Sequence, residues 1–320
     1  MPDLVYSLFQ LYVPLIGWTA LGWLFGKKLP KVYSNRLGKF LFWIGVPISI
    51  VAFLRRTDLS GWIAIAPITA WIAILLGAGL AWMWIGFGLK GERTEPSDPY
   101  WREPTQGSFL LAVMVGNTGY IGYPTILSLI GPEYFSWALL YDLLGTTIGA
   151  YGLGVALAAR LGENLGRQQY SAIRGTLQAL IQNPALWSMV VGLALRPVAL
   201  PAWAESGLNA IAWAVISLAL VLIGMKLSQL RSLGNLKQTL IALGIKMLLV
   251  PLVVGVGLTF FGISGPPHLI LVLQMAMPPA FATLVIAEAY NLDRDLTVTS
   301  LALGTIGLLF TLPIWILLFG

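Results

Sequence analysis

The sequence predicts an all-α integral membrane protein whose ten transmembrane helices form a 5+5 inverted repeat, with one broken helix in each half. Of its 320 residues, 58% are hydrophobic and 10% are charged, whereas an average soluble domain has about 25% charged residues. Apolar runs of about 20 residues, enough for a helix to cross a bilayer, recur along the chain. One apolar run in each half contains a cluster of glycines or prolines.

We place the spans from these apolar runs and the polar loops between them. The first span has neither a basic leader nor a small-residue cleavage site, so we expect it to be retained rather than removed as a signal peptide. Between the fifth and sixth spans, apolar residues recur at helical spacing among polar ones, which predicts an interfacial helix. In chain order, the predicted spans are residues 5–26, 38–54, 62–89, 107–130, 134–159, 184–200, 206–227, 239–263, 268–290 and 296–319.

Lysine and arginine residues predict the orientation. Fifteen of the 19 fall in the odd-numbered connections, which the positive-inside rule places in the cytoplasm. Both termini then lie outside, and a half with five spans must insert upside down relative to the other, which indicates an inverted repeat. Arg55, Arg56 and Arg196 lie on the opposite side. The fifteen are Lys27, Lys28, Lys31, Arg36, Lys39, Lys90, Arg93, Arg102, Arg160, Arg167, Arg174, Lys226, Arg231, Lys237 and Arg294.

The fourth span is interrupted between Val115 and Pro124. Three glycines loosen the helix there, and proline cannot donate a backbone hydrogen bond. Because lipid offers no partner for a free N–H or C=O, such backbone must face protein or a wet cavity. Pro124 at the first helical position would start a second half-helix whose free N–H groups point into the gap. The alternative is that the glycines only permit close helix packing.

Polar groups beside this break predict an anion site. Asn117 and Thr118 add neutral hydrogen-bonding groups next to the helix ends, which suits a carboxylate without a buried cation. The ninth span is interrupted at Pro278 and Pro279, where a simple proline kink is the alternative. Interrupted spans in both halves are typical of a secondary-transporter site. We expect substrate contacts from Asn117, Thr118, Gly119, Tyr120, Asp142 and Met277, and a crossover shaped by Gly116, Gly122, Pro124, Pro278 and Pro279.

Two charged residues fall inside predicted spans. A carboxylate at the depth of Asp142 costs roughly 2.5–3.5 kcal/mol on insertion scales, so its side chain should face protein or water. It is a candidate protonation or coupling site, and a hydrogen-bonding strut between helices is the alternative. Lys246, in the eighth span, is a second candidate for coupling: it either extends its side chain to the membrane surface, which we favour, or pairs with Asp142.

Composition excludes several other functions. With no cysteine and one histidine, the chain has too few ligands for a transition-metal site and cannot form a disulfide. We find no paired acids and no grouping of serine, histidine and aspartate that would support an enzyme, and we expect no cofactor. The net charge of +6 reflects the loop lysines and arginines that set topology, so it does not indicate a nucleic-acid partner.

The broken segments resemble those of the auxin efflux carrier family, which includes the plant PIN-FORMED exporters and many bacterial permeases. Gly116–Pro124 resembles the family's fourth-span pattern, although Gly116 stands where the plant exporters have proline, and the long cytoplasmic loop of those exporters is absent. The likeness covers nearly the whole chain. Further matching positions are Gln274–Pro278, Ala287–Asn291, Asp295 and Leu312–Pro313 in spans nine and ten, and Asn183, Pro184 and Gly192 in span six.

The resemblance implies a bile-acid-symporter/sodium–proton-antiporter-like fold. In that fold helices four and nine cross at their breaks, Asn117 touches the substrate carboxylate, and Pro124 and Pro278 shape the crossover. Scaffold helices, through which such proteins dimerise, would come from residues 1–61 and, with the linker, 161–230. The moving transport domain would come from residues 62–160 and 231–320. The sodium site of the bile-acid symporters needs a cluster of acidic and amide side chains that this sequence lacks.

The sequence therefore predicts a homodimeric carrier in the cell (inner or plasma) membrane that moves a small organic anion by elevator-type alternating access. A sodium- or proton-coupled symporter, with Asp142 as the coupling residue, is the alternative within transport. A membrane receptor or scaffold that binds a ligand without moving it is the alternative from another class.

Overall fold

A computed structural model describes residues 2–55, 57, 59, 62–91, 101–162, 181–229 and 234–320. Within these ranges the chain forms helices joined by turns, and no β-strand occurs there. The all-helical class predicted from the sequence is therefore confirmed. The predicted interfacial helix falls largely on residues 163–180, which lie outside the described residues, as does Arg56.

Six helical segments of the described chain are long and apolar enough to cross a membrane, and helical residues occupy every stretch predicted as a span. Two shorter apolar helices, α10 (Pro184–Ala194) and α14 (Pro266–Met275), lie at the sixth and ninth predicted spans. The 5+5 inverted repeat stays a prediction. The six long segments are Lys31–Leu54, Ile65–Phe87, Phe135–Leu161, Ala202–Ser228, Leu236–Phe260 and Arg294–Phe319.

The chain forms two compact units. Unit 1 comprises Met1–Ile63, Gly119–Leu140 and Gln182–Leu230, and unit 2 comprises Ala64–Thr118, Tyr141–Ile181 and Arg231–Gly320. Residues 119–140, which the sequence analysis assigns to the transport domain of residues 62–160, group with unit 1. The scaffold and transport roles predicted for these parts of the chain stay predictions.

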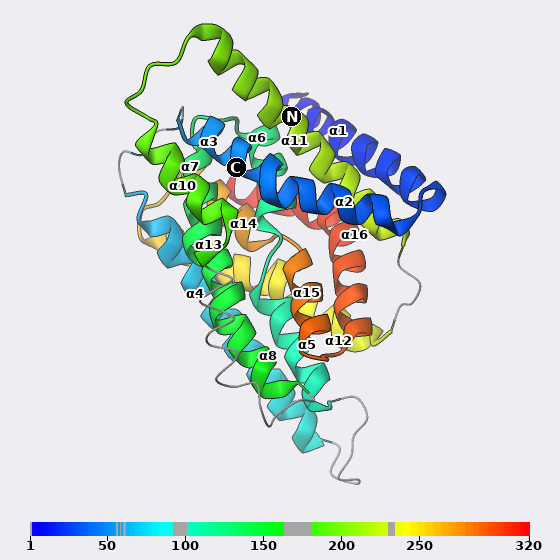
Figure 1. Cartoon of the computed structure of the whole chain (residues 1–320). Coiled ribbons are helices and arrows are strands. Elements are labelled where there is room, and N and C mark those ends of the chain that lie inside the picture. Colours follow the sequence, from blue (N-terminus) through cyan, green and yellow to red (C-terminus); the bar gives the residue numbers. More distant parts are fainter. Residues whose placement is uncertain are drawn as a thin grey trace. The chain divides into compact units, whose positions relative to one another are not determined.

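In unit 1, α1 (Pro2–Lys28) runs along α11 (Ala202–Ser228) (Figure 1). Glycines permit this approach, because a Cβ at Gly22 would overlap the backbone of Val221 and a Cβ at Gly224 would overlap that of Thr19. Small residues at a helix interface let two membrane helices pack closely.

An aromatic cluster joins the remaining helices of unit 1. The ring of Phe53 in α3 (Val46–Leu54) lies 5.1 Å from that of Phe135 and 5.9 Å from that of Trp213, both edge-on. Tyr123 in α6 (Tyr123–Leu129) also meets Phe135, which begins α7 (Phe135–Leu140). Edge-to-face pairs of this kind are a favourable geometry for aromatic rings.

Unit 2 is built around α5 (Glu103–Met114) and α14, whose residues are buried over most of their length. Around them pack α4 (Ile65–Gly91), α8 (Val155–Leu161), α13 (Val250–Phe260), α15 (Phe281–Ala289) and α16 (Arg294–Phe319). The ends of α5 and α14, at Met114 and Met275, are fully buried and therefore shielded by protein.

Asp293 ties three helix starts of unit 2 together. Its carboxylate accepts hydrogen bonds from Thr105 Oγ1 (2.8 Å) at the start of α5 and from Asn235 Nδ2 (2.6 Å) just before α12 (Leu236–Gly244). It also caps α16 by accepting from the Leu296 N–H, and the Ser108 hydroxyl donates to its backbone carbonyl. An N-cap carboxylate satisfies a helix N–H that would otherwise lack a partner, so this residue fixes how these helices begin.

Three π-helical turns each end two residues before a proline. They are η1 (Leu41–Gly45) before Pro47, η2 (Thr118–Gly122) before Pro124 and η5 (Ile245–Leu249) before Pro251. Because proline has no N–H, the carbonyl four residues earlier loses its helical donor, and a widened turn is one way for the helix to continue. Two further π-helical turns, η3 (Tyr141–Thr147) and η4 (Ala150–Gly154), have no proline shortly after them.

Candidate functional site

The two predicted helix breaks pair with each other inside unit 2. Helix α5 ends at Met114 and α14 at Met275, and between them Gly116 and Pro279 form an isolated antiparallel β-bridge. The Asn117 N–H donates to the Pro278 carbonyl (2.7 Å), and the Ala280 N–H donates to the Val115 carbonyl (2.9 Å). The unwound backbone of each break is thus satisfied by the other, which buried polar backbone requires.

Local sequence explains the second break. Pro278 and Pro279 have no N–H to donate, so α14 cannot continue through them, and Ala280 is extended before α15 begins at Phe281. On α16, Gly304 leaves room for the two prolines, because a Cβ there would come within 3.0 Å of Pro278 Cβ and 2.9 Å of Pro279 Cδ. A larger residue at position 304 would push the break away from α16.

The first break differs from the prediction in one respect. The helix resumes at Thr118, as the π-helical turn η2, and Gly122 before α6 is already helical (φ −62°, ψ −49°). The expectation that Pro124 starts the second half-helix is therefore wrong, because proline's fixed φ suits a helix and the turn before it accommodates the missing N–H.

Four predicted site residues fall in unit 1. They are Gly119, Tyr120, Gly122 and Pro124. Tyr120, which is partly buried, packs against an apolar cluster of Leu41, Val215, Ala219 and Leu222. The roles predicted for these four residues in binding or in shaping the crossover stay predictions.

Asn117 presents a free side-chain amide at the paired breaks. The residue is only 7% exposed, its backbone N–H is used by Pro278, and its side chain forms no hydrogen bond with any described residue. Its neighbour across the bridge, Met277, is fully buried. The side-chain amide is therefore left to bind a ligand or water.

Thr118 connects the first break to Asp142. The threonine hydroxyl lies 2.5 Å from Asp142 Oδ1, and both residues are buried in unit 2. This hydrogen bond is of the kind expected for a strut between helices. It also means that the Asp142 carboxylate binds the residue that directly follows Asn117. The coupling role of Asp142 stays a prediction.

Lys246 does not extend to the membrane surface, so the preferred prediction for this residue is wrong. It is 3% exposed, and its Cε and Nζ lie 3.2 Å from the position that a Cβ on Gly116 would occupy. No described carboxylate lies within ion-pair distance of the ammonium, and no described group accepts a hydrogen bond from it. The lysine turns inward because Gly116 leaves space for its tip.

Tryptophans hold the two turns that carry the charged residues. The Trp315 indole donates to the Met247 carbonyl (3.1 Å), the carbonyl in η5 that Pro251 leaves without a helical donor. The Trp71 indole donates to the Leu144 carbonyl (3.1 Å) in η3, the turn that contains Asp142. π-Helical turns are frequent at functional sites. The sequence analysis did not identify either tryptophan. Pro251, five residues after Lys246, was the local signal for a widened turn at the lysine.

The six apolar helical segments of membrane-spanning length and the paired breaks are typical of a multi-spanning membrane transporter. Residues 7–316 match the family described as membrane transport protein, so the chain belongs to this family, and the predicted auxin efflux carrier relationship is confirmed.

Archaeal and bacterial relatives agree with this assignment. The chain is 26% identical to an uncharacterized transporter of Methanothermobacter thermautotrophicus, over 88% of each chain. It is 24% identical to an uncharacterized transporter of Methanocaldococcus jannaschii, over 90% of each chain. It is also 24% identical to the uncharacterized transporter YfdV of Escherichia coli K12, over 62% of this chain and 63% of that protein.

Proposed function

We propose that the protein moves a small organic anion, a carboxylate, across the cell membrane, and that the paired breaks hold it. The observation that carries this proposal is the buried amide of Asn117, without a partner among the described residues and next to the backbone bridge of Gly116 and Pro279. A carboxylate accepts hydrogen bonds only, and bonds in which one partner is charged are roughly twice as strong as neutral ones.

The proposed mechanism is an elevator-type alternation. Unit 2 contains both breaks, Asp142 and Lys246, so a site within it can travel with one body. Spans one to five and six to ten would be related as inverted repeats, with both termini outside and the protein a homodimer through its scaffold helices. Trp71 of span three donates to span five, and Trp315 of span ten donates to span eight. In a 5+5 repeat, span three corresponds to span eight and span five to span ten, so both tryptophans join the same pair of positions, as a repeat would predict.

A proton-coupled carrier is the second candidate, and one observation favours it. Asp142 accepts a hydrogen bond from Thr118, which follows Asn117 directly, so a proton on the carboxyl would alter the contacts of the break. Asp142→Asn decides between the two: an uncoupled carrier should remain partly active and largely independent of pH, whereas a proton-coupled one should lose net uphill transport and keep exchange.

Counterflow in proteoliposomes tests the proposed function. Labelled benzoate outside should accumulate transiently in vesicles that are preloaded with unlabelled benzoate, and other simple carboxylates should compete. A receptor that binds without transport would show binding and no counterflow. In vesicles without preloaded benzoate, net uptake that is driven by an imposed pH gradient and abolished by a protonophore identifies coupling to protons.

Single-cysteine labelling tests the topology, since the chain contains no cysteine. Lys28 and Trp203 are both exposed in unit 1. Lys28→Cys is expected to react with a membrane-impermeant maleimide only from the cytoplasmic side and Trp203→Cys only from the outside, as the lysine and arginine distribution requires. Reaction of both from the same side would contradict the topology.

A further inference from the structure

We infer that Lys246 is the residue that binds the negative charge of the transported anion, and that the site therefore takes singly charged carboxylates. This inference rests on the proposed function and adds to it the residue that supplies the opposite charge. From sequence alone, neutral groups at the helix ends were expected to hold the anion, and Lys246 was considered only for coupling.

The burial of Lys246 is the first reason. Moving an ammonium from water into protein carries a penalty of several kcal/mol unless an opposite charge or hydrogen bonds compensate it. Within the described part of the chain Lys246 is the only buried lysine, and it has neither an acceptor nor an ion-pair partner there. A buried, uncompensated charge that a structural role does not explain is a candidate for binding a ligand of opposite sign.

The backbone around Lys246 holds it in this position. The turn η5 carries the lysine, and Pro251 and the Trp315 indole fix that turn. Gly116 has no side chain on the face where the ammonium lies, and a Cβ there would come within 3.2 Å of Nζ. The side chain of Lys246 thus ends against the backbone of the first break.

The hydrogen-bond donors of Lys246 and Asn117 favour an anion as the ligand. Lysine offers three donors and no acceptor, and the Asn117 amide adds two donors and one acceptor. The backbone carbonyls of Val115 and Pro278 already accept hydrogen bonds from Ala280 and Asn117. A carboxylate can accept hydrogen bonds from both an ammonium and an amide, whereas a cation would be repelled by Lys246.

The charge of the ligand follows from the same residues. One ammonium compensates one carboxylate, and a second negative charge would enter buried surroundings that already contain Asp142. Because a lysine ammonium is a point charge without the planar fork of arginine, it should bind carboxylates of different shapes. We therefore expect monocarboxylates to be preferred over dicarboxylates of similar size.

A thermal-shift experiment on the purified full-length protein tests the inference. Sodium acetate, benzoate and succinate are compared with acetamide and benzamide at constant ionic strength. Benzoate or acetate should stabilise the wild type, the amides should not, and Lys246→Met should weaken carboxylate binding on the order of 10- to 100-fold, the range expected for a bond to a charged group. Lys237→Met, at an exposed lysine of α12, is the matched control and should bind as the wild type does.

The outcomes separate this inference from the proposed function. If the Lys246→Met variant binds benzoate as tightly as the wild type does, the inference is overturned and the proposed function stands. If no carboxylate stabilises the wild type or shows counterflow, the proposed function fails and the inference fails with it. Lys246→Met should be at least as stable as the wild type, because it removes an uncompensated buried charge; a lower melting temperature would show a structural role and overturn the inference.

Discussion

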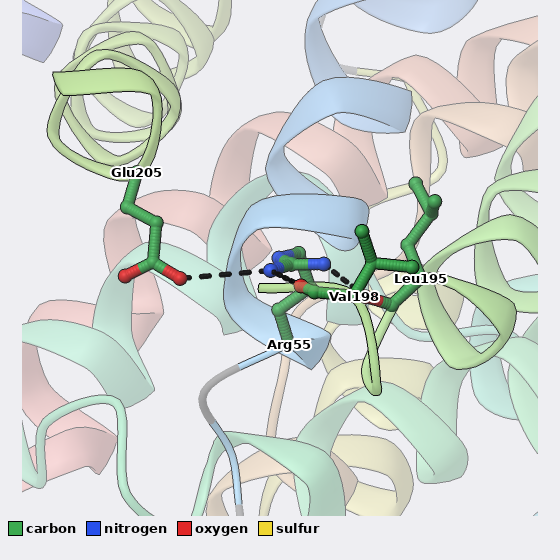
Figure 2. Close-up of polar contacts among 4 residues, drawn as sticks. All are labelled: Arg55, Leu195, Val198 and Glu205. Atoms are coloured by element: carbon green, nitrogen blue, oxygen red, sulfur yellow. Dashed lines mark hydrogen bonds and ion pairs between the residues drawn. The ribbon is translucent and has the colours of Figure 1, made fainter. Parts of the chain in front are cut away.

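The two units differ in the partners that they provide for a buried cationic side chain. In unit 1, Arg55 donates to the carbonyls of Leu195 and Val198 (the latter 2.6 Å) and lies 3.5 Å from Glu205 Oε1 (Figure 2). In unit 2, Lys246 has no acceptor among the described residues. The arginine has a complete set of partners and stabilises the fold, whereas the lysine retains its capacity to bind, which is why we assign the anion to it.

The arginines of unit 1 form a reciprocal pair of helix caps. Arg55 follows α3 and binds carbonyls just beyond α10, and Arg196 follows α10 and donates to the carbonyls of Leu54 (3.2 Å) and Thr57 (2.9 Å) at the end of α3. A cation at a helix C-terminus is favourable because it meets carbonyls that lack helical partners. Two of the three arginines that depart from the predicted charge asymmetry are thus committed to structure.

Replacing Asn117 by aspartate should have the largest effect on the site. If Lys246 binds the anion as we propose, the new carboxylate would compete for its ammonium, and it would repel an incoming anion. We expect carboxylate binding and counterflow to fall below detection, with unchanged or higher thermal stability. A protein with Asn117→Asp that transports benzoate as well as the wild type would show that the anion does not bind at the paired breaks.

Breaking the arginine cap should have the next largest effect, and on stability alone. Arg55→Gln removes charge-assisted hydrogen bonds from a side chain that is 7% exposed, so we expect a loss of about 2 kcal/mol in unfolding free energy. Benzoate affinity should not change. Arg294→Gln is the matched control: Arg294 and Glu288 form an ion pair whose side chains are 60% and 52% exposed, and exposed pairs contribute about 0–1 kcal/mol. Equal losses of unfolding free energy in both variants would show that the buried arginine contributes no more to stability than the exposed one.

Asn117→Ala should weaken anion binding by about 1–3 kcal/mol, the cost of losing one partner of a charge-assisted hydrogen bond. Folding should be spared, since the backbone N–H of residue 117 still reaches the Pro278 carbonyl. Titration of wild type and variant with benzoate by calorimetry measures the difference. An unchanged affinity would place the amide outside the binding site.

Gly116→Ala should have the smallest effect. Its Cβ would lie 3.2 Å from the end of the Lys246 side chain, which can shift by a few tenths of an ångström. We expect a few-fold loss of benzoate affinity and little change in stability. The same substitution at Gly304, where the Cβ would meet two prolines and Leu243, should instead destabilise the protein, because those rings cannot move independently of the backbone.

The sequence located the breaks but not their chemistry. Gly116 and Pro278 mark interrupted helices because glycine and proline act locally, through backbone freedom and a missing N–H. The bridge between Gly116 and Pro279 joins residues far apart in the chain, and no local rule gives such a pairing. The turn η5 and the Trp315 hydrogen bond likewise depend on tertiary packing. This packing directs the Lys246 side chain inward, whereas its position in an apolar helix had suggested that the side chain extends to the membrane surface.

Anomalous scattering from protein crystals soaked in 4-bromobenzoate would test most directly whether the paired breaks bind a carboxylate. We predict a bromine peak in unit 2 beside Gly116 and Pro279, with the carboxylate within about 3.2 Å of Lys246 Nζ and the Asn117 amide, the reach of a hydrogen bond. A peak elsewhere in the protein, with no density at the paired breaks at saturating ligand, would contradict both the site and the role given to Lys246.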